Sequence, residues 1–203
     1  EDSDSAFMTD AVTRHLGRAI RKPWFFHVSY NRPHPPYIAP EPYNDMVHPD
    51  DVPPFRRAAT AEDEAAMHPA VRYFLEFNRQ EKYIPGGEGR IADAPDLHIR
   101  QLRATYYGMV AELDAQLGRL FGHLKQTGAY DDTLIVFTSD HGEQLGDHYL
   151  TNKYGFYDES AHVPLIVKLP RSLANGEAGT VVDAFTESVD LMPTLLELAG
   201  RDV

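Results

Sequence analysis

The sequence contains no cysteine among its 203 residues. This absence excludes a disulfide framework, a thiolate zinc site and a cysteine nucleophile within the chain. Basic residues are also scarce, since 19 Lys and Arg stand against 31 Asp and Glu and give a formal net charge of −12. Such an excess of negative charge disfavours nucleic acid or an anionic membrane as a partner of the whole surface.

Long apolar runs are missing as well. None approaches the roughly 18–20 residues that a membrane span needs, and no signal-peptide pattern is visible. The chain opens on Glu1 rather than on a methionine, so the compartment is left open. A hydrophobic content of 42% is that of a globular protein, and 203 residues suffice for the core of one domain or most of one.

Helical periodicity and β-forming runs alternate along the chain. Leucines and other apolar residues recur every three or four positions from Ile99 to Leu124, with Asp96 as expected N-cap and Gly128 just past the end. Shorter helices are predicted over 10–20, ended by Arg21-Lys22-Pro23, and over 188–199. Strands are predicted over 24–30, 133–140 and 163–169, with a short one near 180–182. This order predicts an α/β fold with a mostly parallel sheet flanked by helices.

Two segments between these elements are irregular. Five prolines between Pro33 and Pro42 forbid both a helix and a central strand, so an ordered loop is expected there. The region 47–95 carries further prolines and the Gly86-Gly87 pair, and we expect a long loop or insertion within the domain. Loops of this length are usually functional or flexible.

Asp140 and His141 are the strongest candidates for chemistry. They end the run of β-formers TLIVFTS, and Gly142 follows at once. Ligands of open α/β sheets collect beyond the carboxyl ends of the strands. A carboxylate and an imidazole there are half of a metal site, for Mn²⁺, Zn²⁺ or Ca²⁺, or half of an acid–base pair. The structural alternative is that Asp140 caps a turn and His141 merely ends a strand.

Two further side chains lie in suggestive loops. His34 stands between prolines in NRPHPP, which restrict the backbone and hold an imidazole in a fixed direction, although an exposed loop histidine is the commoner case. Lys153, in LTNKYGF, would suit a bound oxyanion or a leaving group that gains negative charge, although most loop lysines are solvated. Asp147 and His148 are interpreted as residues that structure the loop, because no H-E-x-x-H pattern occurs.

Three ordered motifs together resemble one known family. They are FFHVSYNRPHPPYIAP, then TLIVFTSDHGEQLGDH, then NKYGFYDESAHVPLIVKLP. Their combination resembles the sulfatase family of the alkaline-phosphatase superfamily over nearly the whole chain. The most similar branch is that of phosphonate monoester hydrolases and related arylsulfatases. The resemblance implies an alkaline-phosphatase-like fold over 1–203, as one partial catalytic domain.

The resemblance also implies roles for the candidate residues. Asp140 and His141 would be ligands of a divalent cation, with Ca²⁺ or Mn²⁺ favoured over Zn²⁺ or Mg²⁺. His34 would contact the ester near the leaving-group oxygen. Lys153 would contact the transferred sulfuryl or phosphoryl group and the leaving group.

Two elements of the family have no counterpart here, and the first is an initial strand that bears an Asp pair or a single Asp ligand. The second is a C/S-x-P-x-R motif whose Cys or Ser is oxidised to formylglycine, the covalent nucleophile, and the chain contains no such motif. We therefore expect the nucleophile-bearing N-terminal part of the catalytic domain outside this chain, and expect the chain by itself to be inactive.

The function implied is hydrolysis of sulfate, phosphonate or phosphate esters of small molecules by a full-length enzyme that is expected to be a homo-oligomer. A phosphotransferase or phosphomutase of the same superfamily is an alternative. So is a non-catalytic binding module that keeps the fold, which the missing nucleophile favours. Sulfate, phosphonate and phosphate are near-isosteric, and the sequence does not choose among them.

Overall fold

The computed structural model of the chain describes residues 3–18, 23–174, 176 and 178–201. The described residues form two compact units. Unit 1 comprises Glu1–Asp131 and His141–Val163, and unit 2 comprises Asp132–Asp140 and Pro164–Val203. Within the described residues, no helix is both long enough and apolar enough to cross a membrane.

Helix α4 (Asp96–Gln126) is the longest element of unit 1. It confirms the helix predicted from the leucine periodicity, and Gly128 takes the left-handed conformation just past its end. Its start differs by one residue from the prediction, since Pro95 is the N-cap and Asp96 lies in the first turn. Asp96 instead accepts two hydrogen bonds from Arg57.

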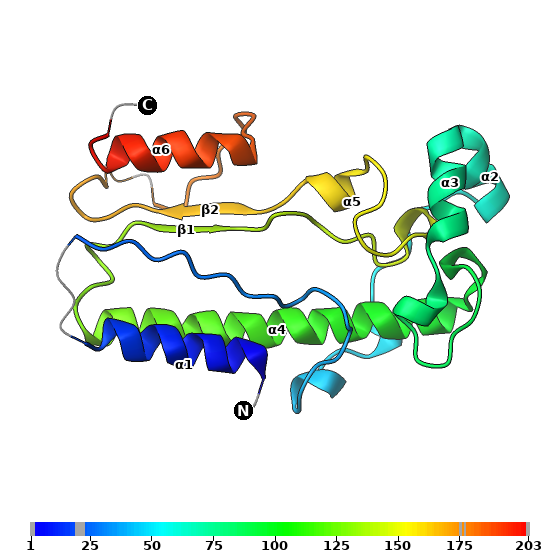
Figure 1. Cartoon of the computed structure of the whole chain (residues 1–203), viewed down its shortest axis with the longest axis horizontal. Coiled ribbons are helices and arrows are strands. Elements are labelled where there is room, and N and C mark those ends of the chain that lie inside the picture. The colour runs from blue at the N-terminus through cyan, green and yellow to red at the C-terminus, as the bar shows by residue number, and fades with distance from the viewer. Residues whose placement is uncertain (1–2, 19–22, 175, 177, 202–203) are drawn as a thin grey trace. The chain divides into compact units, whose positions relative to one another are not determined.

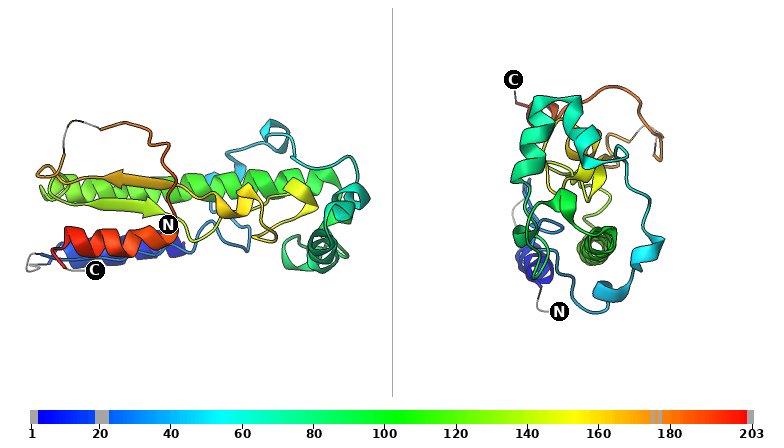
Figure 2. Two further views of the ribbon diagram at one scale, coloured as in Figure 1. Left: turned by 90° about the horizontal axis from the view of Figure 1, so that it is seen from above. Right: turned by 90° about the vertical axis from the view of Figure 1, so that its right-hand side faces the viewer.

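Helix α1 (Asp4–Leu16) packs along α4. Figure 1 shows the two helices running side by side, and the end-on view of Figure 2 shows them as neighbours. Ser3 caps α1 by accepting a hydrogen bond from the Ala6 amide. The helix predicted over 10–20 is therefore present but starts six residues earlier, and the predicted stop at Arg21-Lys22 lies outside the described residues.

The segment Trp24–Tyr30 is extended but is not a strand, so the predicted strand is wrong. Its side chains alternate between half-buried and exposed, as in a strand. The half-buried side rests on α1, where the Tyr30 hydroxyl bonds Thr9 at 2.9 Å and the Phe26 ring meets His15. A strand also requires a hydrogen-bonded neighbour, and within the described residues this segment has none.

The region 47–95 is not a plain loop, because it folds into two helices. Helices α2 (Ala61–Met67) and α3 (Pro69–Phe77) pack on each other. Ala65 and Leu75 form a small apolar core there with Leu150. Short 3₁₀ turns join the irregular parts, at Tyr43–Asp45, Pro49–Asp51, Gln80–Lys82, Ile91–Asp93 and Asp147–Tyr149. A further short helix, α5 (Asp158–Ala161), completes unit 1.

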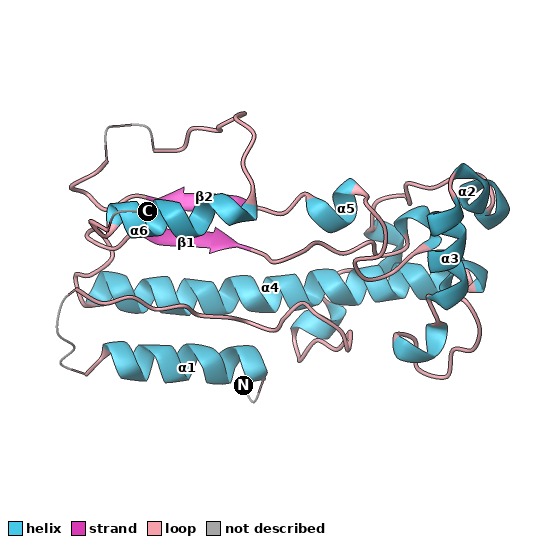
Figure 3. Cartoon of the chain, turned by 45° about the horizontal axis from the view of Figure 1, so that its top comes forward, coloured by secondary structure: helices cyan, strands magenta, loops and turns pink. Residues whose placement is uncertain are grey.

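Unit 2 is built on a pair of short strands. Strands β1 (Ile135–Thr138) and β2 (Leu165–Lys168) pair with Ile135 opposite Lys168, and Figure 3 shows them in magenta. The pairing is antiparallel, whereas the alternating pattern predicted a mostly parallel sheet. A 3₁₀ turn (Ser188–Asp190) leads into α6 (Leu191–Leu198), which confirms the predicted last helix. No strand forms at 180–182 in this described stretch.

These elements give an α/β fold, as predicted. The strands are shorter than their apolar runs, because backbone pairing, and not composition, decides where a strand ends.

Candidate active site

His34 lies exposed in the proline-rich loop of unit 1. Arg32 organises this loop by donating hydrogen bonds to the carbonyls of Ile38 at 2.6 Å and Pro36 at 3.2 Å. The Nδ1 atom of His34 is 2.8 Å from the Pro35 carbonyl oxygen. A carbonyl only accepts hydrogen bonds, so Nδ1 carries the proton and Nε2 is the nitrogen that can exchange one.

Both ring nitrogens of His141 have hydrogen-bond partners. Its Nδ1 is 2.8 Å from the carbonyl oxygen of Gly142, and its Nε2 is 2.7 Å from Nζ of Lys153. The ammonium donates, so Nε2 of His141 presents a lone pair. An imidazole whose tautomer is fixed by a backbone carbonyl is typical of metal ligands and of catalytic bases.

The structure therefore brings three of the four predicted residues together within unit 1. The rings of His34 and His141 lie edge to face with their centroids 6.3 Å apart, and Lys153 reaches His141. Asp140 precedes His141 directly in the chain and is the last residue of the first segment of unit 2. His34 is far in sequence from His141 and Lys153, yet the fold places the two imidazoles and the ammonium in one region.

The donor chemistry at His141 fits a divalent cation only in part. Its Nε2 is the kind of donor that Mn²⁺ and Zn²⁺ accept, but in this structure that lone pair accepts a hydrogen bond from Lys153, which a cation would have to displace. Among the described residues, however, no group of three or more His, Cys, Asp or Glu side chains is placed to hold a metal ion. The described residues therefore form no metal site by themselves, and the ligand roles of Asp140 and His141 stay predictions.

Gly142 is required by the close approach of another segment. A Cβ atom at this position would lie 2.1 Å from the carbonyl oxygen of Glu159. The Gly142 amide donates to the Ser160 carbonyl at 2.8 Å. The glycine after Asp140-His141 therefore lets the backbone after His141 pair closely with the start of α5.

The loop between His141 and Lys153 has an unusual backbone. Five of its residues have left-handed φ angles, namely Leu145 (50°), Gly146 (94°), His148 (53°), Tyr149 (58°) and Asn152 (67°). All four non-glycine residues with positive φ in the described part of the chain lie here. Such backbone costs on the order of 1–3 kcal/mol per residue and concentrates at functional sites.

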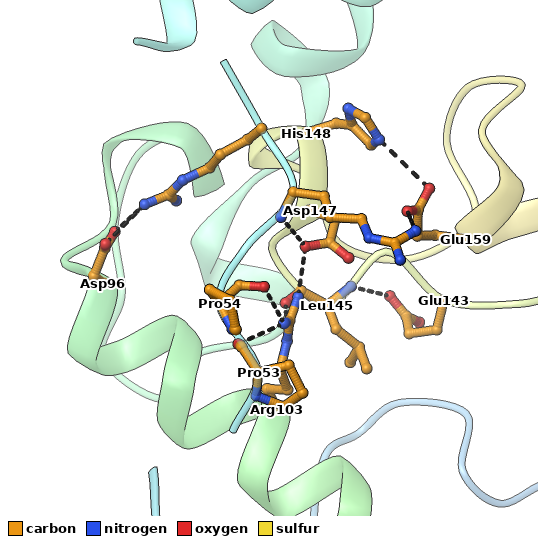
Figure 4. Close-up of polar contacts among 11 residues, drawn as sticks. Pro53, Pro54, Asp96, Arg103, Glu143, Leu145, Asp147, His148 and Glu159 are labelled. Atoms are coloured by element: carbon orange, nitrogen blue, oxygen red, sulfur yellow. Dashed lines mark hydrogen bonds and ion pairs between the residues drawn. The ribbon is translucent and has the colours of Figure 1, made fainter. Parts of the chain in front are cut away.

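Buried polar contacts from α4 hold this loop (Figure 4). Arg103 is 3% exposed and donates to Asp147 at 2.8 Å and to the Leu145 carbonyl at 3.0 Å. It also donates to the carbonyl of Pro53 at 3.0 Å, and Asp147 accepts from the Arg56 amide at 2.7 Å. Asp147 therefore structures the loop, as predicted.

His148 has a similar structural role. Its Nδ1 lies 2.8 Å from the buried carboxylate of Glu64, and its Nε2 lies 3.4 Å from Glu159. Its ring stacks on Tyr157 at 3.7 Å, nearly parallel. These contacts tie the loop to α2 and α5, so His148 is not available as a third partner of His34 and His141.

Sequence reasoning did not single out Glu143. Its carboxylate accepts hydrogen bonds from the amides of Asn152 and Leu145. Burial raises the pKa of the Glu143 carboxyl. Burial also raises the pKa of Tyr83 and of Tyr106, each to about 12, so both neighbouring hydroxyls stay protonated at neutral pH. The sequence signal was present, as an acidic residue directly after Asp140-His141-Gly142.

Comparison with known proteins agrees with this architecture. The family model described as Sulfatase matches residues 1–201. The chain therefore belongs to the sulfatase family, as the three motifs predicted.

Individual relatives point to the predicted branch. The chain is 45% identical over 202 residues to the multifunctional alkaline phosphatase superfamily protein PehA of Trinickia caryophylli, and covers 39% of that protein. It is 35% identical over 178 residues to an arylsulfatase of Clostridium perfringens, with 88% of the chain matched and 34% of the relative covered. The phosphonate monoester hydrolase of Agrobacterium radiobacter matches its fold with a TM-score of 0.91 and 47% identity.

The last match covers 98% of this chain and 39% of the hydrolase structure. The chain thus spans between about one third and two fifths of the length of these relatives, and its fold is part of an alkaline-phosphatase-like domain.

Proposed function

We propose that the full-length gene product hydrolyses small-molecule esters of sulfate or phosphonate, with phosphate esters as near-isosteric substrates. This chain would supply His34, Asp140, His141 and Lys153 to its active site. The observation that carries the proposal is the 2.7 Å contact between Lys153 Nζ and His141 Nε2, with the His34 ring beside them. Membership of the sulfatase family and the names of the relatives support the reaction class.

Lys153 and His34 would act on the leaving group. When the bond between the ester oxygen and sulfur or phosphorus breaks, negative charge develops on the departing alkoxide. A fixed ammonium stabilises that charge, and a protonated imidazole whose Nδ1 is already committed to the Pro35 carbonyl donates from Nε2. Such proton donation contributes on the order of 10²–10⁴ in rate.

Asp140 and His141 would hold a divalent cation, Ca²⁺ or Mn²⁺, together with ligands from outside this chain. When bound, such a cation neutralises negative charge on the reacting oxyanion. The covalent nucleophile would be a formylglycine, which also lies outside this chain because no C/S-x-P-x-R motif occurs in it.

The test measures turnover of paired aryl sulfates and aryl phosphonate monoesters by the full-length gene product, over leaving groups of low to high pKa. His34→Ala should lower kcat about 10²–10⁴-fold for poor leaving groups and much less for good ones, because only poor ones need a proton. Lys153→Ala should show the same trend. Lys82→Ala, which changes an exposed lysine of a 3₁₀ turn, is the matched control and should be unchanged.

If the wild type turns over neither the aryl sulfates nor the aryl phosphonate monoesters, the proposed reaction is refuted. Equal losses across the leaving-group series would refute the roles given to His34 and Lys153.

A further inference from the structure

The chain leaves His141 and returns to it within a short loop. Lys153 lies twelve residues after His141, yet its Nζ is 2.7 Å from the His141 ring. The return is made through residues 145–152, the loop that holds five left-handed residues. Because this backbone is intrinsically unfavourable, interactions at its ends must keep it in place.

Glu143 ties the two ends of this loop together. Its Oε1 atom accepts the amide of Leu145 at 3.5 Å, at the start of the loop, and the amide of Asn152, at its end. Beside it, the Gln144 amide donates to the Asn152 carbonyl at 3.0 Å. The same carboxylate oxygen thus joins residues that are seven positions apart.

Asn152 connects Glu143 to the backbone of Lys153. Its Oδ1 accepts the Lys153 amide at 2.7 Å, and its Nδ2 donates to the Tyr83 hydroxyl at 3.3 Å. Asn152 has a φ of 67°, which asparagine tolerates better than most residues. The backbone of Lys153 is therefore fixed from the preceding residue, while its long side chain stays exposed.

Glu143 also acts on the loop that carries His34. Tyr37, three residues after His34, is largely buried, and its buried hydroxyl interacts with the Glu143 carboxylate. Burial and then the negative charge of Glu143 raise the pKa of Tyr37. The Glu143 carboxylate thus borders all three segments that carry His34, His141 and Lys153.

We propose that Glu143 is a positioning residue, which closes the 145–152 loop through Asn152 so that the Lys153 ammonium meets the leaving group beside His141. This inference rests on the proposed function and assigns a role that neither the family match nor the candidate residues supply. A reacting group displaced by about 1 Å can lose about 10²-fold in rate. Glu143 need not touch substrate to have this effect.

The test compares Glu143→Ala with Glu143→Gln in the full-length gene product. Gln keeps an Oε1 acceptor for the amides of Leu145 and Asn152, whereas Ala removes it. Glu143→Ala should lower kcat about 10²-fold for poor leaving groups and far less for good ones, as Lys153→Ala does. Glu143→Gln should restore most of the rate.

A second readout does not depend on activity. Amide hydrogen exchange of the peptide covering residues 145–156 should be at least about tenfold faster in Glu143→Ala than in the wild type, because the loop opens more often. Glu143→Gln should exchange as the wild type does. Glu62→Ala, an exposed carboxylate on α2, is the matched control for both measurements.

If Glu143→Ala fails to fold, Asn152→Gly replaces it. Glycine accepts the left-handed φ but removes the bonds to the Lys153 amide and to Tyr83, so the same leaving-group trend is expected. Wild-type exchange in the 145–156 peptide of the variant, or equal rate losses for all leaving groups, would overturn the inference. A wild type without ester hydrolysis would instead refute the proposed function, and hydrogen exchange alone would then decide whether Glu143 positions the loop.

Discussion

At the scale of single residues, the motif after β1 is shaped by backbone as much as by chemistry. Gly142 has no side chain because the Glu159 carbonyl occupies the space a Cβ would need. Gly146 likewise leaves room for Ile99 and Phe55, whose side chains a Cβ would meet at 2.3 and 2.9 Å. The residue types between Asp140 and Lys153 are therefore determined by close approaches between segments of unit 1 as well as by the candidate reactive groups.

Gly142→Ala should destabilise the full-length gene product by about 1–3 kcal/mol, because the new methyl group forces the backbone away from Glu159. Gly118→Ala is the matched control, since nothing lies within 4 Å of the Cβ it would gain on α4. It should be stabilising by about 0.5–1 kcal/mol through helix propensity. Urea titration of the two variants measures both effects, and an equal effect of the two substitutions would contradict the steric argument.

Asp93 offers a prediction on pH. Arg90 donates to both of its carboxylate oxygens, at 2.7 and 2.8 Å, and this contact holds the pKa of Asp93 below its usual value of 3.8. A lowered folded-state pKa contributes stability above the unfolded pKa, and this contribution is lost as pH falls through the folded pKa. The pair is half exposed, so its contribution stays below about 1 kcal/mol.

Asp93→Asn should therefore lower the melting temperature slightly at pH 7, and the difference from the wild type should vanish as pH falls below 3.8. Thermal unfolding between neutral pH and about pH 2 at low salt measures this. A difference that stays constant over the whole range would show that Asp93 acts through something other than its charge.

At the scale of elements, local patterns predicted the helices and tertiary pairing decided the strands. The period of the leucines gives α4 directly, and Gly128 marks its end. The aromatic run Trp24–Tyr30 gives an extended backbone with alternating burial, but only a paired neighbour would make it a strand. The direction of pairing between β1 and β2 depends on how the chain returns, which no local pattern contains.

The same contrast applies to the candidate site. The residue types of His34, Asp140, His141 and Lys153 were visible because each follows a recognisable segment. Arg103 and Glu143 were not singled out, because their importance lies in contacts with residues distant in sequence. Arg103 contacts Leu145, 42 positions away, and Glu143 contacts Asn152, nine positions away. Sequence periodicity placed Arg103 on α4 but could not show that this arginine is buried.

Two of the ion pairs that α4 makes differ in burial, and they give a matched experiment. Arg103 is buried against Asp147, whereas Arg119 and Asp10 are each about half exposed. Arg103→Met should cost about 3–5 kcal/mol, because it leaves the Asp147 carboxylate and several carbonyls without their donor. Arg119→Met should cost at most about 1 kcal/mol.

Denaturant titration of both variants measures the difference. Adding Asp147→Asn to Arg103→Met should cost less than the sum of the single changes, with a coupling of about 0.5–3 kcal/mol. Strict additivity, or equal costs for the two arginines, would show that Arg103 does not hold the 145–152 loop.

At the scale of the whole molecule, the chain corresponds to only part of the length of its relatives. It matches 39% of the length of the relative PehA and contains no formylglycine motif. Asp140 and His141 are proposed as a pair of metal ligands, and His34 and Lys153 are proposed to face the leaving group. A metal site of three or four ligands thus needs groups beyond those that the described residues bring together.

The last prediction follows from this division of ligands. In the full-length gene product, we expect a chelator to abolish ester hydrolysis and added Ca²⁺ or Mn²⁺ to restore it, since Asp140 and His141 are proposed to hold the cation. Asp140→Ala and His141→Ala should each weaken Mn²⁺ binding by at least about 10–100-fold, the loss that removal of even an outer-shell partner produces.

Asp45→Ala, which removes an exposed carboxylate in a 3₁₀ turn of unit 1, should leave Mn²⁺ binding unchanged. Isothermal titration of the chelator-treated proteins gives the affinities, and an Asp140→Ala variant with wild-type affinity would remove this carboxylate from the proposed site. Residues 1–203 alone should bind Mn²⁺ as weakly as these variants, because a carboxylate and an imidazole without further ligands make an incomplete site.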